Sequence, residues 1–181
     1  QQGKLRQLST IPVGGDHITN DLALGLRTSY YSAETLKLAH GCALISQADP
    51  EAKIEVSTVG SKERRLVSER EIARFIEPRV QEIFQITREE SIETGWPELP
   101  PAGLVLCGGV SAMPGIIDVA RLYFNGDQVR LAEVDYAGIQ NPIYTAAVGT
   151  LYYVHRQNPR QFAAERSKPA HKQKPGIWQR I

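Results

Sequence analysis

The sequence is poor in the residues that build metal sites, disulfide frameworks and membrane spans. Its 181 residues include two cysteines and four histidines, and these lie singly rather than at the spacing of a zinc site. We therefore expect no metal site, and we expect Cys42 and Cys107 to be reduced thiols. No apolar run approaches the roughly 20 residues that cross a bilayer, and no apolar signal-peptide region follows Gln1.

The net charge of +1 is unevenly distributed along the chain. Residues 158–181 contain six basic residues against one acid, Glu165, which leaves 15 basic and 19 acidic residues in positions 1–157. This acidic excess argues against a nucleic-acid-binding domain, so we expect no nucleic-acid partner. The basic tail is rich in proline, glutamine and lysine, and it is predicted to be a disordered linker over residues 158–175.

An apolar run from Leu104 ends abruptly in Gly108 and Gly109 and then enters a segment that starts a helix. A short apolar run of this kind predicts a strand that is buried on both faces. Because the glycines carry no side chain, a nucleotide base or ribose can approach the backbone beside the helix N-terminus. Taken alone, the pattern is more often explained by tight packing of a strand against a helix.

A second glycine pair, Gly14 and Gly15, follows a short apolar stretch and precedes another predicted helix. The next predicted helix has Ser32 as its N-cap and carries Glu34 and Lys37 three residues apart. These two side chains share one face of the helix. They can therefore pair with each other, or they can offer a carboxylate and an ammonium to a ribose and base.

The remaining periodicity predicts alternating strands and helices, and hence an α/β fold. Ser68 and Glu71 form a capping box that opens a long helix, and Pro78 is expected to kink it. The other predicted elements are strands over residues 8–13, 43–46, 54–59, 64–67 and 129–134, and helices over residues 116–124 and 141–155.

In this order the motifs resemble the C-terminal half of FtsA, the bacterial cell-division relative of actin. The segments that carry the resemblance are IPVGGDHITNDLA, AETLKLAHGCAL, FIEPR, LVLCGGVSAMPG and YTAAVG, and they span about residues 8–157. A glycine pair after a strand occurs throughout the actin and sugar-kinase superfamily, so the specificity comes from the order of all five.

The resemblance implies an actin-like (ribonuclease H-like) sheet flanked by helices, with an inserted α+β subdomain. Residues 1–28 and 102–157 correspond to subdomain 2A, and residues 29–101 correspond to the inserted subdomain 2B. The family's other phosphate-binding hairpin and the N-terminal half of its cleft are not found in this sequence. We therefore expect ATP with Mg²⁺ to be the cofactor of the full-length protein, with none bound tightly by this chain.

The resemblance also assigns residues to a nucleotide site without assigning a catalytic residue. It places Gly14 and Gly15 near the phosphates, Glu34 and Lys37 at the ribose and base, and Gly108 and Gly109 at the adenosine. We expect no enzymatic activity from this chain and at most a feeble ATPase in the full-length protein. The alternative is a set of packing glycines and a surface ion pair.

Partner and membrane contacts follow from the same resemblance. Arg79 and Glu82, on the helix that contains Pro78, are expected to bind the C-terminal peptide of FtsZ, the tubulin-like ring protein. The alternative interpretation of Arg79 and Glu82 is an ordinary ion pair on a solvated helix face. Residues 176–181 resemble the start of an amphipathic membrane-targeting helix, and the alternative there is a frayed chain end. Its predicted membrane residues are Ile177, Trp178, Arg180 and Ile181.

The predicted function is that of an adaptor that ties FtsZ filaments to the cytoplasmic face of the cell membrane at the division site. Further expected partners are other FtsA subunits in a filament and an anionic membrane surface. The rival hypothesis is a phosphotransferase of the same superfamily, such as a sugar kinase. A third possibility is another actin-like adaptor, for instance of a pilus assembly platform.

Overall fold

The computed structural model describes residues 5–60, 64–98, 101–124, 128–133 and 141–157. The chain divides into two compact units, Gln1–Thr145 and Ala146–Ile181. The described part of the second unit belongs to helix α5 (Thr145–Gln157). The predicted linker over 158–175 and the predicted membrane residues Ile177, Trp178, Arg180 and Ile181 lie outside the described residues.

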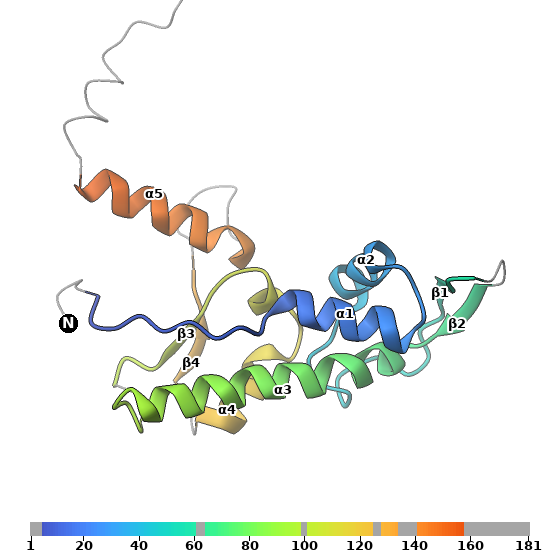
Figure 1. The fold of residues 1–181 in the computed structure, drawn as a ribbon, viewed down its shortest axis with the longest axis horizontal. Coiled ribbons are helices and arrows are strands. Elements are labelled where there is room, and N and C mark those ends of the chain that lie inside the picture. The colour runs from blue at the N-terminus through green and yellow to red at the C-terminus, as the bar shows by residue number, and fades with distance from the viewer. Residues whose placement is uncertain (1–4, 61–63, 99–100, 125–127, 134–140, 158–181) are drawn as a thin grey trace, which may run out of the picture. The chain divides into compact units, whose positions relative to one another are not determined.

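The first unit mixes helices with short strands (Figure 1). Helices α1 (Gly15–Gly25) and α2 (Tyr30–His40) come first, followed by strands β1 (Ile54–Ser57) and β2 (Arg64–Val67) and the long helix α3 (Glu69–Glu93). Strand β3 (Leu104–Leu106), a 3-10 helix (Val110–Ala112), helix α4 (Ile116–Phe124), strand β4 (Val129–Leu131) and a second 3-10 helix (Pro142–Tyr144) complete the unit.

Two pairs of strands form, one antiparallel and one parallel. Strands β1 and β2 pair antiparallel, with Ile54 opposite Val67. Strands β3 and β4 pair parallel, with Leu104 opposite Val129. A parallel pair needs a crossover connection, and α4 lies within this one. The mixed helix and strand content agrees with the predicted α/β class.

The long helix α3 begins at the residue that the sequence predicts. The Ser68 hydroxyl accepts a hydrogen bond from the Glu71 amide at 3.1 Å, as an N-cap serine should. Pro78 lies inside the helix, which continues past it to Glu93. After the helix ends, the Trp96 amide donates to the Ser91 carbonyl at 2.8 Å and satisfies one of the last free carbonyls.

Four helices of the first unit share one hydrophobic core. Helix α3 contacts α1, α2 and α4, and its buried side chains recur every four residues, on one face of the helix. Burial of each such side chain stabilises the fold by about 1.5–3 kcal/mol. The core includes Ile18, Leu22, Ile72, Ile76, Val80, Val119, Ala120 and Phe124. Helices α1, α3 and α4 all contribute to this core, so it extends across the predicted subdomain boundaries near residues 28 and 101. These boundaries stay a prediction.

Two local predictions near α2 are wrong. The N-cap of α2 is Ser29 rather than Ser32, because the Ser29 hydroxyl accepts from the Ser32 amide at 3.1 Å, one turn inside the helix. Residues 43–46 do not form the expected strand. Their backbone is satisfied elsewhere, since the Ala43 amide donates to the Pro114 carbonyl and the Ile45 amide donates to the Glu77 carboxylate.

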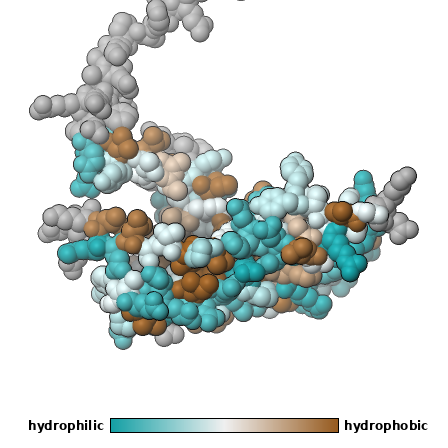
Figure 2. Space-filling model, in the orientation of Figure 1, coloured by the Kyte–Doolittle hydropathy of each residue, from teal (hydrophilic) through white to brown (hydrophobic). Residues whose placement is uncertain are grey.

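The N-terminal segment and β3 also differ from expectation. The described residues 5–13 form no strand, so the predicted strand over 8–13 is not found there. Strand β3 is not buried on both faces, because Val105 remains 41% exposed. Other large hydrophobic side chains, such as Leu5, Leu8 and Leu24, are exposed as well. Brown patches therefore interrupt the hydrophilic surface in Figure 2.

Candidate functional site

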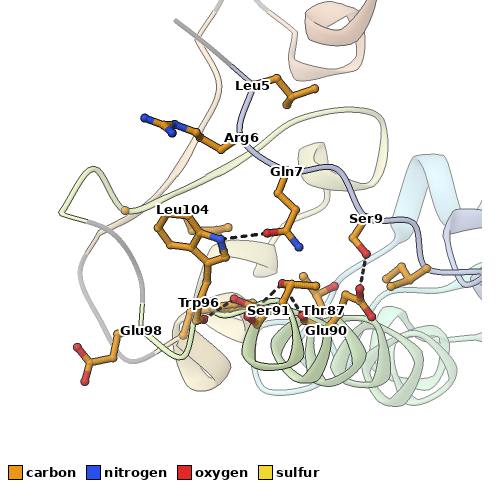
Figure 3. A pocket seen from close by; sticks show the side chains of 14 residues that line it. Leu5, Arg6, Gln7, Ser9, Thr87, Glu90, Ser91, Trp96, Glu98 and Leu104 are labelled. Atoms are coloured by element: carbon orange, nitrogen blue, oxygen red, sulfur yellow. Dashed lines mark hydrogen bonds between the residues drawn. The ribbon is translucent and has the colours of Figure 1, made fainter. Parts of the chain in front are cut away.

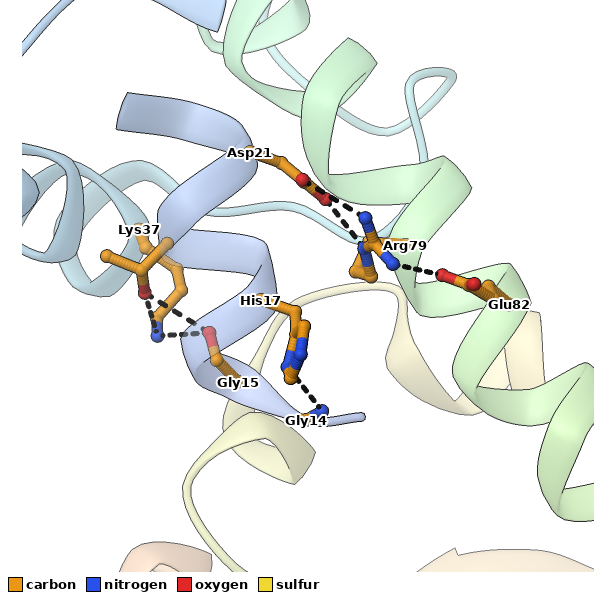
Figure 4. Close-up of polar contacts among 8 residues, drawn as sticks. Gly14, Gly15, His17, Asp21, Lys37, Arg79 and Glu82 are labelled. Atoms are coloured by element: carbon orange, nitrogen blue, oxygen red, sulfur yellow. Dashed lines mark hydrogen bonds and ion pairs between the residues drawn. The ribbon is translucent and has the colours of Figure 1, made fainter. Parts of the chain in front are cut away.

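The first glycine pair lies at the N-terminus of α1. Gly14 is the extended N-cap residue, and its amide donates to Nδ1 of His17 at 3.3 Å (Figure 4). A Cβ atom added at Gly14 would meet no atom within 4 Å. The backbone is therefore bare at the end of a helix where amide groups favour an anion.

Gly15 brings the two predicted glycine motifs together. A Cβ atom at Gly15 would lie 2.9 Å from a methyl carbon of Val110 and 3.6 Å from Nζ of Lys37. At 2.9 Å the Val110 methyl group would have to shift to admit a side chain at Gly15. Val110 directly follows Gly109, so the start of α1 lies close to the residue after the second glycine pair. The role of both glycine pairs at a nucleotide stays a prediction.

Lys37 is buried beside this contact and is fully partnered. Its side chain is 8% exposed, and Nζ donates to the Gly15 carbonyl at 3.0 Å and to the Thr19 hydroxyl at 2.7 Å. It also forms an ion pair with Glu34 at 2.7 Å. These three acceptors match the three N–H donors of an ammonium group. The side chain thus braces α1 and α2 against each other.

Thr19 is a member of this cluster that sequence reasoning missed. It is completely buried, and its hydroxyl contacts the Glu34 carboxylate at 2.5 Å and the Gly15 carbonyl at 3.1 Å. Burial raises the pKa of Glu34, but hydrogen bonds from Lys37 and Thr19, together with the Lys37 charge, outweigh it and hold this pKa below its usual value. Glu34 is therefore a carboxylate at neutral pH.

The second glycine pair follows β3 and also leaves its backbone bare. Gly108 has a positive φ of 96°, which a residue with a side chain rarely adopts, and a Cβ there would meet nothing within 4 Å. Its amide donates to the Pro142 carbonyl and to the Thr145 hydroxyl, each at 3.2 Å. These bonds fasten the loop to residues 142–145 of the same unit. At Gly109 the nearest atom to an added Cβ would be 3.9 Å away, on Ile143.

Arg79 makes a contact that the sequence did not indicate. Its guanidinium contacts the Asp21 carboxylate of α1 twice, through Nε at 2.6 Å and Nη2 at 3.1 Å, and Nη1 contacts Glu82 (Figure 4). The predicted pair with Glu82 is present, but Arg79 also joins α1 to α3. The hydrogen bond to Asp21 is the largest of the effects that raise the pKa of Arg79.

A groove that the sequence did not indicate lies between the N-terminal segment and the end of α3 (Figure 3). Its volume is about 560 Å³, and its walls include Leu104 and Phe124. Two side-chain contacts hold the segment there: Trp96 Nε1 donates to Gln7 at 3.2 Å, and the Ser9 hydroxyl contacts Glu90. The predicted nucleotide and partner residues do not line this groove.

Metal-binding and membrane-spanning features are absent from the residues that the structure describes. Within them, no three histidine, cysteine or acidic side chains form a group that could hold a metal ion. The helices described there also lack one that is long and apolar enough to cross a membrane.

Comparison with known proteins gives a consistent result. A family model described as "Cell division protein FtsA" matches residues 1–149. The chain is 38% identical over 158 residues to the cell division protein FtsA of Pseudomonas aeruginosa, with 84% of this chain and 37% of that protein covered. For the Bacillus subtilis protein the identity is 37% over 156 residues, covering 86% and 35%. For the Escherichia coli protein it is 34% over 165 residues, covering 83% and 39%.

The chain thus spans a little over a third of the length of these relatives. The family model nevertheless covers most of the chain, including both glycine pairs and the helix that carries Arg79. This chain therefore belongs to the FtsA family of cell-division proteins.

Proposed function

We propose that this chain is the part of an actin-like cell-division adaptor that supplies one side of an ATP cleft and binds the FtsZ C-terminal peptide. Its tail then tethers FtsZ filaments to the cytoplasmic face of the membrane at the division site, and other FtsA subunits extend the filament. Membership of the FtsA family supports the cell-division role over that of a sugar-kinase-like phosphotransferase. We propose no catalytic residue.

The observation that carries the nucleotide part of the proposal is the convergence of three sequence segments at Gly15. The Gly15 carbonyl accepts from Lys37, and its α-carbon faces Val110, the residue after the second glycine pair. The fold thus brings residues 15, 37 and 110 together, and we take this meeting point as the edge of the proposed site. Bare backbone at Gly14 and Gly108 gives that edge room for a flat ligand.

The residues present fit one side of a nucleotide. The amide groups at the start of α1 suit a phosphate, and the Glu34 carboxylate, with about a third of its side chain exposed, suits ribose hydroxyls as an acceptor. Lys37 contributes by holding Glu34 and Gly15 in place, because its three donors are already used. ATP with Mg²⁺ would supply the phosphate charge and the metal, and the metal's remaining ligands would come from the phosphates, water or other parts of the protein.

Arg79 supports the proposed peptide site. A guanidinium binds carboxylates through paired N–H groups, and Arg79 already does so with Asp21. Its side chain is 26% exposed and that of Glu82 is 45% exposed, so solvent reaches both charges. A peptide that mixes acidic, basic and apolar residues finds complementary groups on this part of α3.

The tail supports the membrane part of the proposal through its composition. Residues 158–181 combine six basic residues with Ile177, Trp178 and Ile181 near the end. Each Lys or Arg near an anionic leaflet contributes about 1 kcal/mol. Full burial of each apolar side chain adds roughly 1.5–3 kcal/mol, less the cost of ordering a short helix.

The nucleotide half-site is tested with Gly14→Ala and a matched control, Gly149→Ala. In neither case does the added Cβ come within 4 Å of an atom of the described residues, and of the two glycines only Gly14 belongs to the proposed site. We expect Mg·ATP to bind the parent chain at millimolar strength at best, without hydrolysis, and to shift the amide NMR signals of Gly14, Gly15, Gly108 and Gly109. Gly14→Ala should lose these shifts and Gly149→Ala should keep them. A low-micromolar dissociation constant by calorimetry, or shifts elsewhere, would contradict the half-site.

The peptide site is tested by Arg79→Glu, with Arg121→Glu as its control. Arg121 also pairs with an acid three residues earlier, Asp118, but on α4. Reversing the Arg79 charge should weaken micromolar binding of an FtsZ C-terminal peptide by on the order of 1–3 kcal/mol, because a charge-assisted contact becomes a repulsion. Fluorescence anisotropy measures the affinity, and circular dichroism confirms that each variant is folded. If the Arg79→Glu variant is folded and its affinity for the peptide is unchanged, Arg79 is not part of the peptide-binding site.

The membrane proposal is tested by measuring the contribution of the basic residues and that of Trp178 separately. Co-sedimentation with vesicles that contain anionic lipid should fall as the salt concentration rises, because screening weakens attraction by the basic residues. At fixed salt it should fall again in Trp178→Ala, because an apolar anchor is lost. If Trp178→Ala sediments as well as the parent chain, residues 176–181 are not the membrane anchor.

A further inference from the structure

The guanidinium of Arg79 already holds two carboxylates of its own chain. Asp21 occupies one bidentate edge through contacts at 2.6 Å and 3.1 Å, and Glu82 contacts Nη1. Asp21 comes from α1, 58 residues earlier in the sequence, whereas Glu82 is one turn further along α3. The Nε and Nη2 donors, which could bind a carboxylate of a partner as a pair, are therefore already occupied by Asp21.

We propose that Asp21 is an internal competitor for Arg79, an autoinhibitory contact that a carboxylate of the partner peptide must displace. This inference rests on the proposed peptide site on α3. Asp21 occupies the place that a carboxylate of the peptide would take. The measured affinity for an acidic peptide is therefore the free energy of the Arg79–peptide contact minus that of the Arg79–Asp21 contact that it replaces. The partner class is an acidic peptide segment that presents a carboxylate to Arg79.

The exposure of the two side chains makes this exchange feasible. Asp21 is 29% exposed and Arg79 is 26% exposed, and partly exposed ion pairs contribute little net stability. The contact of α1 with Lys37 is different, since Lys37 is 8% exposed and has all three donors engaged. Breaking that contact would leave a buried charge unpaired. Of these two contacts, the one between Asp21 and Arg79 is therefore the exchangeable one.

A competitor and a purely structural contact predict opposite effects on binding. If Asp21 serves only to hold α1 against α3, its removal lowers the stability and either leaves the peptide affinity unchanged or weakens it. If Asp21 competes, its removal lowers the stability but strengthens binding, because the Arg79 edge becomes free. The sign of the change in affinity separates the two.

The experiment compares Asp21→Asn with Asp118→Asn in the full chain. Both substitutions remove one negative charge, and Asp118 lies on α4, where it contacts Gln47 and Arg121. We expect Asp21→Asn to bind a labelled FtsZ C-terminal peptide about three- to tenfold more tightly, as expected from loss of a partly exposed ion pair. Asp118→Asn should not change the affinity. Replacing the acidic residues of the peptide by Asn and Gln should abolish the gain.

A measurement on the parent chain keeps the inference testable if Asp21→Asn is too unstable to measure. Peptide binding should shift the side-chain carboxylate NMR signal of Asp21, because its contact with Arg79 is displaced, and should leave the corresponding signal of Asp118 unchanged. The inference is overturned if the parent binds the peptide and Arg79→Glu weakens binding, yet Asp21→Asn does not bind more tightly or the Asp21 signal does not move. If the parent chain does not bind the peptide at all, the proposed peptide site fails and the inference fails with it.

Discussion

The buried ammonium of Lys37 is the interaction on which the candidate site depends. Removing an ammonium from water costs several kcal/mol unless acceptors replace the lost hydration. Here the Gly15 carbonyl, the Thr19 hydroxyl and the Glu34 carboxylate replace it, all within 3.0 Å. The start of α1 is therefore held against α2, and Gly15 also lies close to Val110, the residue after the second glycine pair.

Helix α1 is held at a second point by a contact of a different kind. Asp21 lies almost two turns beyond Gly15 and pairs with Arg79 of α3, where solvent reaches both side chains. One contact is buried and has all its donors engaged, whereas the other is partly exposed and open to exchange. The proposed nucleotide edge and the proposed peptide site thus share one short helix, whose rigid end carries the glycine pair.

Local sequence patterns predicted the elements that depend on local chemistry. Strand β2 and helix α4 have the bounds that periodicity indicated, and Ser68 caps α3 as expected. The ion pair of Glu34 with Lys37 follows from their spacing on one helix. Thr19 and Asp21 were missed because their partners lie 18 and 58 residues away, so the contacts arise only when the helices pack. The groove beside Trp96 depends in the same way on Gln7, 89 residues earlier.

Amide hydrogen exchange of α1 in the Lys37→Met variant tests the central role of Lys37 most directly. Methionine keeps an unbranched side chain that reaches as far as Cε, but it removes the ammonium group with its charge and all three donors. We expect amides in the first turns of α1 to exchange on the order of tenfold faster or more, because a braced helix end becomes free to open locally. Amides of the C-terminal half of α3 should keep their protection. Unchanged exchange at the start of α1 would contradict the account, since the glycine pair would then be held without Lys37.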